Sequence, residues 1–249
     1  MRAIEAHGVT HSWSPNFGFK LVAQAIERSG RPFAHDVSSL RRLMNAGEQC
    51  VAEVCDSFLR LTGLASHVMQ PAFGMAEVCT CMTYNNAYGP ASNVHVARES
   101  LASNQLEIVP RGLEGTTLSF VDLGPPSPGV EIRICAQDGM TELIERQVGR
   151  FQIRGPCVMR GYYDHPDANR ESFAGDGWFD SGDLGFINGG RLVLTGRAKE
   201  MIIVRGVNHY CYEIEDAVTQ LSGTVAARVA VTSVYSESIG TEELLVFFV

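Results

Sequence analysis

The segment from Gly177 to Gly185 reads Gly-Trp-Phe-Asp-Ser-Gly-Asp-Leu-Gly, and a run of short apolar stretches surrounds it. At its end, Leu184–Ile187 and Arg191–Leu194 flank a compact Asn-Gly-Gly turn, which predicts an antiparallel hairpin. Before it, Val130–Cys135 and Val148–Arg154 have the same short, β-prone character. We therefore expect a small β-rich subdomain around this segment.

The first 84 residues show a different pattern, in which helical and strand periods alternate. Apolar stripes predict helices over Phe17–Arg28 and Val51–Leu61, and a glycine two residues beyond each helix is a stop signal. Buried strands are predicted within Asp36–Asn45 and over Val68–Phe73. The alternation of strand and helix predicts an α/β fold with a parallel sheet.

The last part of the chain, residues 199–249, has a third character. Its pattern predicts a strand at Met201–Arg205, a helix at Tyr212–Leu221, and strands at Val225–Val231 and Leu244–Val249. This order predicts a small α+β unit. Because the unpaired edge of an apolar terminal strand would invite aggregation, we expect further chain to follow it.

Composition and charge exclude several classes of protein. The 249 residues are 45% apolar with a net charge of −8, which is typical of a globular chain and argues against nucleic acid as a partner. No apolar run approaches the roughly 20 residues that span a membrane, and no secretory signal is visible. Seven cysteines without a C-x-x-C pair predict reduced thiols. We expect a cytoplasmic protein without a membrane span.

Four glycine-containing segments stand out as candidates for chemistry, namely Asn45–Glu48, Phe73–Glu77, Gly177–Gly185 and Gly196–Glu200. Each places a carboxylate or an arginine beside a glycine at the end of a predicted strand. Ligands of α/β enzymes bind outside the carboxyl ends of parallel strands. Each segment alone is typical of an ordinary turn, but the four together, in this order, indicate a ligand site.

The order of these segments resembles the adenylate-forming superfamily of acyl- and aryl-CoA ligases, luciferases and adenylation domains of peptide synthetases. Such enzymes use ATP to convert a carboxylate into an acyl-adenylate and pyrophosphate, and then transfer the acyl group to a thiol. The resemblance runs over essentially the whole chain and is most specific over Gly177–Glu215. It implies that residues 1–197 are the C-terminal portion of a large ATP-binding domain, with an α/β part at 1–84 and an insertion plus the β-rich subdomain at 85–197. Residues 199–249 would then be a truncated, mobile lid.

Individual roles follow from the resemblance. Phe73–Glu77 resembles the aromatic-Gly-x-Thr-Glu motif, with alanine in place of the threonine. The resemblance implies that Phe73 stacks near the adenine and that Glu77 is a catalytic residue that holds Mg²⁺, a hard cation suited to carboxylate oxygen. Asp183 would accept hydrogen bonds from the ribose hydroxyls, and Arg197 would be a second catalytic residue at the ribose and phosphates. The residues implied to bind ATP are Asn45, Ala46, Gly47, Glu48, Phe73, Gly74, Met75, Asp183 and Arg197.

Within the superfamily, the sequence most resembles the fatty acyl-AMP ligases. Val204–Tyr210 resembles the loop that follows their hinge, with Cys211 in place of a proline, and Lys199 falls on the hinge itself. The polar stretch Val94–Asp122, with one predicted strand at Thr117–Val121, lies where these ligases carry an extra segment. That segment implies poor use of coenzyme A and transfer of the acyl group to the phosphopantetheine of an acyl carrier protein.

The opening Thr10–Phe19 resembles versions of these ligases that are fused to polyketide or nonribosomal peptide synthases, so other synthase modules are expected partners. In that family the region lines the acyl pocket, although a helix start with core aromatics would explain the same residues. The residues implied to line a pocket for a carboxylic acid, expected to be a fatty acid, are Trp13, Asn16, Phe17 and Gly74.

Two parts of such a ligase are missing from the sequence. A Ser/Thr/Gly-rich phosphate loop that ends in lysine does not occur, and the two lysines are Lys20, on the first predicted helix, and Lys199. Neither lies where the family's C-terminal lysine contacts the carboxylate during adenylation. We therefore expect an internal piece of a longer ligase that is incomplete and inactive in isolation.

Two alternatives remain open. One is a CoA ligase or an amino-acid adenylation domain, against which the insertion and the Asn208–Tyr210 loop argue. The other is a catalytically inert, ligase-like docking module, which the missing loop and lysine favour. Retention of Glu77, Asp183 and Arg197 argues for an active parent enzyme.

Overall fold

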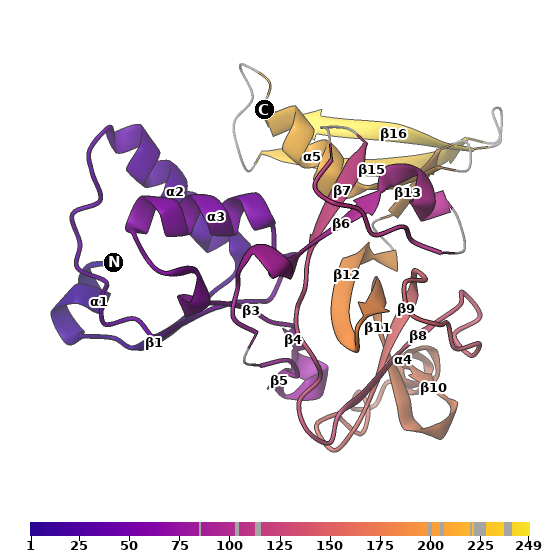
Figure 1. Cartoon of the computed structure of the whole chain (residues 1–249). Helices are drawn as coiled ribbons and strands as arrows, with labels where there is room; N and C mark the ends of the chain where they lie inside the picture. Colours follow the sequence, from indigo (N-terminus) through magenta and orange to yellow (C-terminus); the bar gives the residue numbers. More distant parts are fainter. Residues whose placement is uncertain are drawn as a thin grey trace.

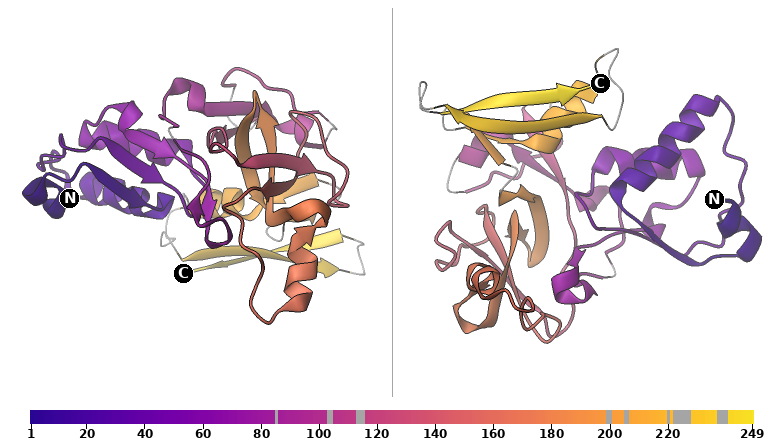
Figure 2. Two further views of the ribbon diagram at one scale, coloured as in Figure 1. Left: turned by 90° about the horizontal axis from the view of Figure 1, so that it is seen from below. Right: turned by 180° about the vertical axis from the view of Figure 1, so that it is seen from behind.

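The computed structural model has three parts, which follow one another along the sequence colouring of Figure 1. An α/β part is followed by a β-rich subdomain and then by a small α+β unit, and the other views separate the same three parts (Figure 2). The expected hinge residue Lys199 lies outside the described residues. The residues that the structure describes are 1–84, 86–102, 105–112, 116–198, 201–204, 207–219, 221, 228–236 and 241–249.

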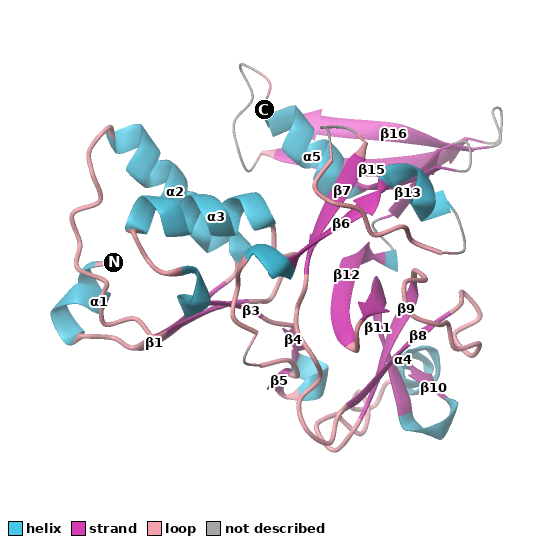
Figure 3. Cartoon of the chain, in the orientation of Figure 1, coloured by secondary structure: helices cyan, strands magenta, loops and turns pink. Residues whose placement is uncertain are grey.

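Parallel strands form the sheet of the α/β part. The strands β1 (His11–Ser14), β2 (Arg42–Asn45) and β3 (Met69–Pro71) pair in this order, and both pairs are parallel. Helices α2 (Asn16–Ser29) and α3 (Ala52–Thr62) lie side by side next to this sheet (Figure 3). The predicted α/β fold with a parallel sheet is therefore confirmed.

Packing and glycine stop signals explain these two helices. The rings of Phe19 and Phe58, both buried, meet edge to face with centroids 4.9 Å apart. Gly30 and Gly63 follow the helices in the left-handed conformation, at φ values of 60° and 73°, which glycine adopts without a Cβ clash. Each predicted helix end lies within one residue of the observed one.

Two short N-terminal elements are not predicted by the sequence pattern, namely α1 (Arg2–His7) and β1. The helix α1 has no buried residue, and the side chains of β1 are alternately exposed and half-buried. Neither therefore shows the strong apolar periodicity on which such predictions depend. As a consequence Trp13 is a residue of an edge strand rather than of a helix start.

Antiparallel pairing builds the β-rich subdomain. Its five-stranded sheet has the order β10-β11-β9-β8, and the last strand, β12, also pairs with β11. The predicted β-rich subdomain and its hairpin are confirmed. The strands are β8 (Glu131–Cys135), β9 (Gly149–Arg154), β10 (Phe173–Ala174), β11 (Trp178–Asn188) and β12 (Arg191–Arg197).

A bulge in β11 corrects one expectation about the segment Gly177–Gly185. The register between β11 and β9 shifts between Asp180 and Leu184, and Gly182 between them has a φ of 76°. An Asp180 carboxylate oxygen accepts a hydrogen bond from the Gly182 N–H at 2.9 Å, which stabilises the turn. Asp183 thus lies inside a long, bulged strand, and the expectation that it follows a strand end is wrong.

The stretch Val94–Asp122 is less polar in structure than its composition indicates. It contains an antiparallel pair of β6 (Asn93–Ala97) and β7 (Thr117–Val121), of which only β7 is predicted from the sequence. Val96 and Phe120 from this pair are fully buried in a second hydrophobic cluster that includes residues of β11 and β12. The pair is therefore part of the folded core.

The C-terminal unit has the predicted α+β character. Strands β13 (Met201–Val204) and β14 (Val207–Tyr210) form a hairpin, helix α5 (Cys211–Thr219) follows, and β15 (Val229–Ser236) pairs with β16 (Thr241–Phe248). The helix ends earlier than predicted, and β15 is described from Val229. Residues 222–227, which include the predicted start of that strand, lie outside the described residues.

Apolar packing and two ion pairs attach the described residues of this unit to the other two parts. Tyr210 is buried in the second hydrophobic cluster, where its ring meets that of Phe120 edge to face at 6.3 Å. Arg98 forms an ion pair with Glu213 at 3.2 Å, and Lys20 forms one with Asp216 at 3.1 Å. The α5 helix is thus tied both to the insertion and to α2.

The remaining elements are short and connect these layers. No helix in the described part of the chain is long and apolar enough to cross a membrane. All seven cysteines are free thiols, and three of them are buried. The short elements are η1 (Ser66–Val68), β4 (Gly74–Met75), η2 (Ala76–Val78), β5 (Thr80–Cys81), η3 (Pro90–Ser92), η4 (Arg98–Ala102), α4 (Pro166–Ser172) and η5 (Gly175–Gly177).

Candidate functional site

Asp183 and Arg197 are cross-strand neighbours, as partners in the register of β11 and β12. The Arg197 Nε donates a hydrogen bond to the Asp183 carboxylate at 3.2 Å. Asp183 is buried, whereas the Arg197 side chain is 56% exposed. The structure therefore joins two of the predicted site residues, one as a fixed acceptor and one as a guanidinium that solvent or a ligand can reach.

Buried hydrogen bonds hold the Asp183 side of this pair. The Ser181 hydroxyl donates to the Phe151 carbonyl at 3.1 Å and accepts the Asp183 N–H at 3.1 Å. Arg150 forms an ion pair with Asp180 at 2.7 Å in the same bulge. These bonds fix the backbone on which the Asp183 carboxylate is presented.

A glycine precedes Arg197 because the chain passes close to an aromatic ring there. Gly196 has a φ of 156°, and an added Cβ would lie 2.9 Å from the Tyr210 ring. A side chain at this position would displace Tyr210, which is one of the buried residues of the C-terminal unit. The Gly196–Arg197 dipeptide therefore contacts both Asp183, through the arginine, and Tyr210 of the C-terminal unit, through the glycine.

Glu77 lies on η2, which connects the two short paired strands β4 and β5. Gly74 allows this pair to form, because an added Cβ would lie 2.0 Å from the Thr80 carbonyl oxygen. The Tyr162 hydroxyl donates a hydrogen bond to the Glu77 carboxylate at 3.0 Å, and the Met159 N–H donates to the Glu77 carbonyl at 2.8 Å. Burial, and secondarily the hydrogen bond to Glu77, raises the pKa of Tyr162, so the phenol remains the donor.

The residues present fit a Mg²⁺ ion that is shared with phosphates. Among the described residues no three His, Cys, Asp or Glu side chains gather into a preformed metal site. Mg²⁺ in phosphate-transfer sites is commonly held by one or two carboxylates together with the substrate's phosphates, and it keeps several waters. The half-buried Glu77 carboxylate, bonded through one oxygen to Tyr162, supplies a single hard ligand of this kind.

Phe73 lies largely in the core. Its ring is 8% exposed and meets the ring of Phe151 edge to face, with centroids 5.2 Å apart. Its backbone N–H donates to the Thr83 hydroxyl at 2.7 Å. Most of the ring is therefore packed in the core, and the expected stacking near the adenine stays a prediction.

The segment Asn45–Glu48 is divided between core and surface. Asn45 and Ala46 are buried at 0% and 2% exposure, and the Asn45 amide donates to Asn16 Oδ1 at 3.2 Å. Their side chains therefore support the loop, and the expected contact of this segment with a nucleotide stays a prediction. Gly47, at a φ of 97°, and Glu48 are the exposed residues of the segment.

Three of the four residues expected to line an acyl pocket, Trp13, Asn16 and Phe17, lie next to this segment or contact it. Glu48 accepts a hydrogen bond from the Phe17 N–H, and Gly47 faces the Trp13 ring, where an added Cβ would lie 3.5 Å from the indole. Trp13 and Phe17 are exposed, at 59% and 44%. Asn16 is buried, and its Oδ1 also accepts the Val51 N–H at 3.1 Å.

Sequence reasoning missed several residues near these motifs. The Cys81 thiol lies 3.3 Å from the Met44 sulfur, so β5 touches β2 next to Gly74 and Asn45. Tyr162 contacts Glu77 from 85 residues away. Met44 could be found as the residue before the Asn45 segment, but the sequence has no local signal for Tyr162.

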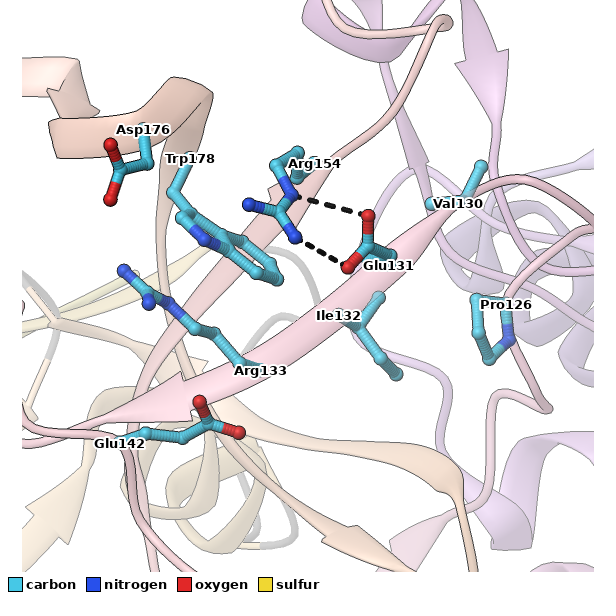
Figure 4. A pocket seen from close by; sticks show the side chains of 9 residues that line it. All are labelled: Pro126, Val130, Glu131, Ile132, Arg133, Glu142, Arg154, Asp176 and Trp178. Carbon is cyan, nitrogen blue, oxygen red and sulfur yellow. Dashed lines mark hydrogen bonds and ion pairs between the residues drawn. The ribbon is translucent and has the colours of Figure 1, made fainter.

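One cavity, of about 560 Å³, lies on the β-rich subdomain and contains none of the predicted site residues (Figure 4). On its wall the Trp178 ring is stacked between Arg133 and Arg154, whose guanidinium carbons lie 4.3 and 4.6 Å from the ring centroid. Arg154 also forms two hydrogen bonds to Glu131, at 3.2 and 2.6 Å. These contacts stabilise the sheet face.

The fold and these motifs agree with comparisons to known proteins: the chain belongs to the AMP-binding enzyme family, whose model matches residues 1–163. It is 33% identical over 226 residues to the nonribosomal peptide synthetase btyA of Aspergillus terreus, which covers 88% of this chain and 22% of that protein. The chain spans about a quarter of the length of the curated relatives it matches.

Three solved structures resemble the chain along nearly all its length. A multidomain structure of a keto acid-selecting nonribosomal peptide synthetase module matches with a TM-score of 0.87 and 37% identity, over 98% of this chain and 21% of that one. The adenylation and carrier domains of McyG with phenylalanyl-adenylate match with 0.80 and 35%, over 99% and 36%. Fatty acyl-adenylate ligases from E. coli and L. pneumophila match with 0.83 and 26%, over 98% and 44%.

These findings confirm the resemblance to the adenylate-forming superfamily and the α/β fold. The chain is a partial adenylate-forming domain of the type found in nonribosomal peptide synthetases. The matched structures are a keto acid-selecting module, a complex with phenylalanyl-adenylate and fatty acyl-adenylate ligases. Membership of the family therefore does not define the class of acid that is activated.

Proposed function

We propose that this chain is part of an enzyme that activates a carboxylic acid with ATP and Mg²⁺ as an acyl-adenylate, releasing pyrophosphate. The acyl group then passes to the phosphopantetheine thiol of a carrier protein within a multi-module synthase. The observation that carries the proposal is the cross-strand pair of Asp183 and Arg197. An anionic acceptor beside a reachable guanidinium suits a ribose diol that is joined to a phosphate.

Each site residue has a distinct task in the proposed reaction. Asp183 binds the ribose hydroxyls, and Arg197 donates hydrogen bonds toward the ribose and the α-phosphate. Glu77 supplies the carboxylate for Mg²⁺, which when bound neutralises charge on the phosphates. Gly47 and Glu48 form the exposed turn beside the acyl pocket, next to Trp13 and Phe17.

The acid proposed is a 2-oxo acid rather than the fatty acid expected from the sequence. A buried α-ammonium group needs a carboxylate partner, and the pocket residues Trp13, Asn16 and Phe17 provide none. Glu48, a carboxylate beside them, already accepts the Phe17 N–H. Between the two kinds of acid without an ammonium group, the keto acid module has the higher identity, 37% against 26%.

The test is acid-dependent ATP–pyrophosphate exchange by the full-length protein. Phenylpyruvate and phenylalanine form a matched pair that differs at the α-carbon, and a long-chain fatty acid is the third arm. We expect at least tenfold faster exchange with a 2-oxo acid. Preference for phenylalanine would identify an amino-acid domain, and preference for the fatty acid would restore the original expectation. No exchange with any acid would favour an inert docking module.

The acceptor is tested in the second half-reaction. We expect the full-length protein to load a carrier protein in strong preference to free coenzyme A. Comparable formation of acyl-CoA would instead place the protein among the CoA ligases.

A further inference from the structure

We propose that Tyr162 is a positioning residue for the Glu77 carboxylate and that Asn169 holds Tyr162 in place. The β-rich subdomain would thereby aim the carboxylate that the α/β part contributes to the metal. This inference rests on the proposed function, in which Glu77 holds Mg²⁺. Neither Tyr162 nor Asn169 belongs to the motifs that indicate that function.

The loop that contains Tyr162 holds Glu77 at two points. The Tyr162 hydroxyl donates to the side-chain oxygen Oε1 at 3.0 Å, and the Met159 N–H donates to the Glu77 main-chain carbonyl at 2.8 Å. The helix η2 that bears Glu77 has only three residues, so it has little rigidity of its own. Both the backbone and the carboxylate of Glu77 therefore depend on this loop.

Asn169, on α4, fixes the loop in turn. Its Oδ1 accepts the Tyr162 N–H at 2.6 Å, and its Nδ2 donates to the Tyr162 carbonyl at 2.9 Å. Gly161 has a φ of 146°, and an added Cβ would lie 2.9 Å from Asn169 Oδ1. The close approach of the amide to the loop therefore requires a glycine at this position, and the two bonds clamp the Tyr162 backbone.

An oriented carboxylate binds a cation without first losing its own torsional freedom. Loss of residues that hold a metal ligand typically weakens metal binding by about 10- to 100-fold. We therefore expect Tyr162→Phe, which removes a single hydroxyl, to weaken the metal site about tenfold while leaving nucleotide affinity without metal unchanged. Tyr163 offers a matched control, because its side chain is 96% exposed.

The experiment measures Mn²⁺, as a probe for Mg²⁺, by electron paramagnetic resonance in the full-length protein with a non-hydrolysable ATP analogue. We expect about tenfold weaker Mn²⁺ binding for Tyr162→Phe, a similar loss for Asn169→Ala, and no change for Tyr163→Phe. Excess Mg²⁺ should restore pyrophosphate exchange by Tyr162→Phe. Wild-type Mn²⁺ affinity in Tyr162→Phe would overturn the proposal.

A double-mutant cycle separates this inference from the proposed function and from a general loss of packing. If Tyr162 acts through the carboxylate, Tyr162→Phe should have no further effect on Mn²⁺ binding in a Glu77→Gln background. Equal losses in both backgrounds would show that the tyrosine only packs the loop, and would overturn the proposal. If Glu77→Gln alone left Mn²⁺ affinity unchanged, Glu77 would not be a metal ligand. That result would contradict the metal role in the proposed function, and the positioning role of Tyr162 would be overturned with it.

Discussion

The proposed ribose end (Asp183 and Arg197) and the proposed metal end (Glu77) of the candidate site are built in different ways. Asp183 and Arg197 lie 14 residues apart on paired strands, so one stretch of chain carries both partners. Glu77 is held by a tyrosine 85 residues away, across the boundary between the α/β part and the β-rich subdomain. The first arrangement depends on local pairing, whereas the second depends on how the two parts pack. Damage to packing should therefore affect metal binding before it affects ribose binding.

The largest effect is expected at the metal end. Glu77→Gln removes the charge that would hold Mg²⁺ while it preserves the shape of the side chain, so exchange turnover should fall by about two to three orders of magnitude. Nucleotide affinity should fall much less, because the ribose end is intact. Steady-state exchange kinetics and nucleotide titration in the full-length protein check this split, with exposed Glu53→Gln as control. Equal losses of turnover and affinity would contradict the assignment.

At the ribose end, Asp183→Ala should mainly weaken ATP binding. Hydrogen bonds to a charged group contribute about 1.5–3 kcal/mol, so affinity should fall about ten- to a hundredfold. The acid pocket should be unaffected, and the apparent affinity for the acid should stay within twofold. Calorimetric titration of ATP checks the change, and Asp167→Ala, whose side chain is 81% exposed, is the control. Unchanged ATP affinity would show that Asp183 does not bind the nucleotide.

A smaller effect is expected where the insertion contacts the C-terminal unit. Arg98→Ala removes the ion pair to Glu213 and should change the ratio of carrier loading to coenzyme A use by a few-fold, while pyrophosphate exchange stays near normal. Separate assays of the two half-reactions measure this. Arg111→Ala, an exposed position in the same stretch, is the control. If pyrophosphate exchange changed as much as acyl transfer to the thiol, the ion pair would stabilise the fold in general rather than act in the transfer step.

The smallest effect concerns pH. Burial raises the pKa of Glu213 above its ordinary value of 4.5, and Arg98 partly offsets this. An acid with a raised pKa binds more protons in the folded state, so its contribution to stability is complete below pH 4.5 and is lost as the pH rises through the raised pKa. The melting temperature of Glu213→Gln relative to wild type should therefore rise by about 2 °C between pH 4 and pH 7. A difference in melting temperature that does not change with pH would contradict the raised pKa of Glu213.

The difference between local pairing and the packing of distant segments also explains what could be predicted from the sequence. The parallel α/β part and the hairpin follow from local signals such as apolar periodicity and glycine turns, and the structure extends that hairpin so that Asp183 lies opposite Arg197. Tyr162 could not be predicted, because its partner is distant in the chain and neither residue carries a local signal for the contact. The strand β6 was missed because its core-facing side chains occur in a polar stretch, and the burial of the Phe73 ring could not be predicted because a motif does not reveal burial. The hinge role of Lys199 stays a prediction.

The β6–β7 pair has a consequence for engineering of synthetases. Its Phe120 and the Tyr210 of the C-terminal unit belong to one hydrophobic cluster, and Gly196 must remain small for Tyr210 to fit there. A chimera that exchanges the insertion between enzymes without this aromatic partner would leave a void or a clash of side chains. The practical unit of transplantation therefore runs from the insertion through Tyr210, and a junction placed between them would cut through a shared core.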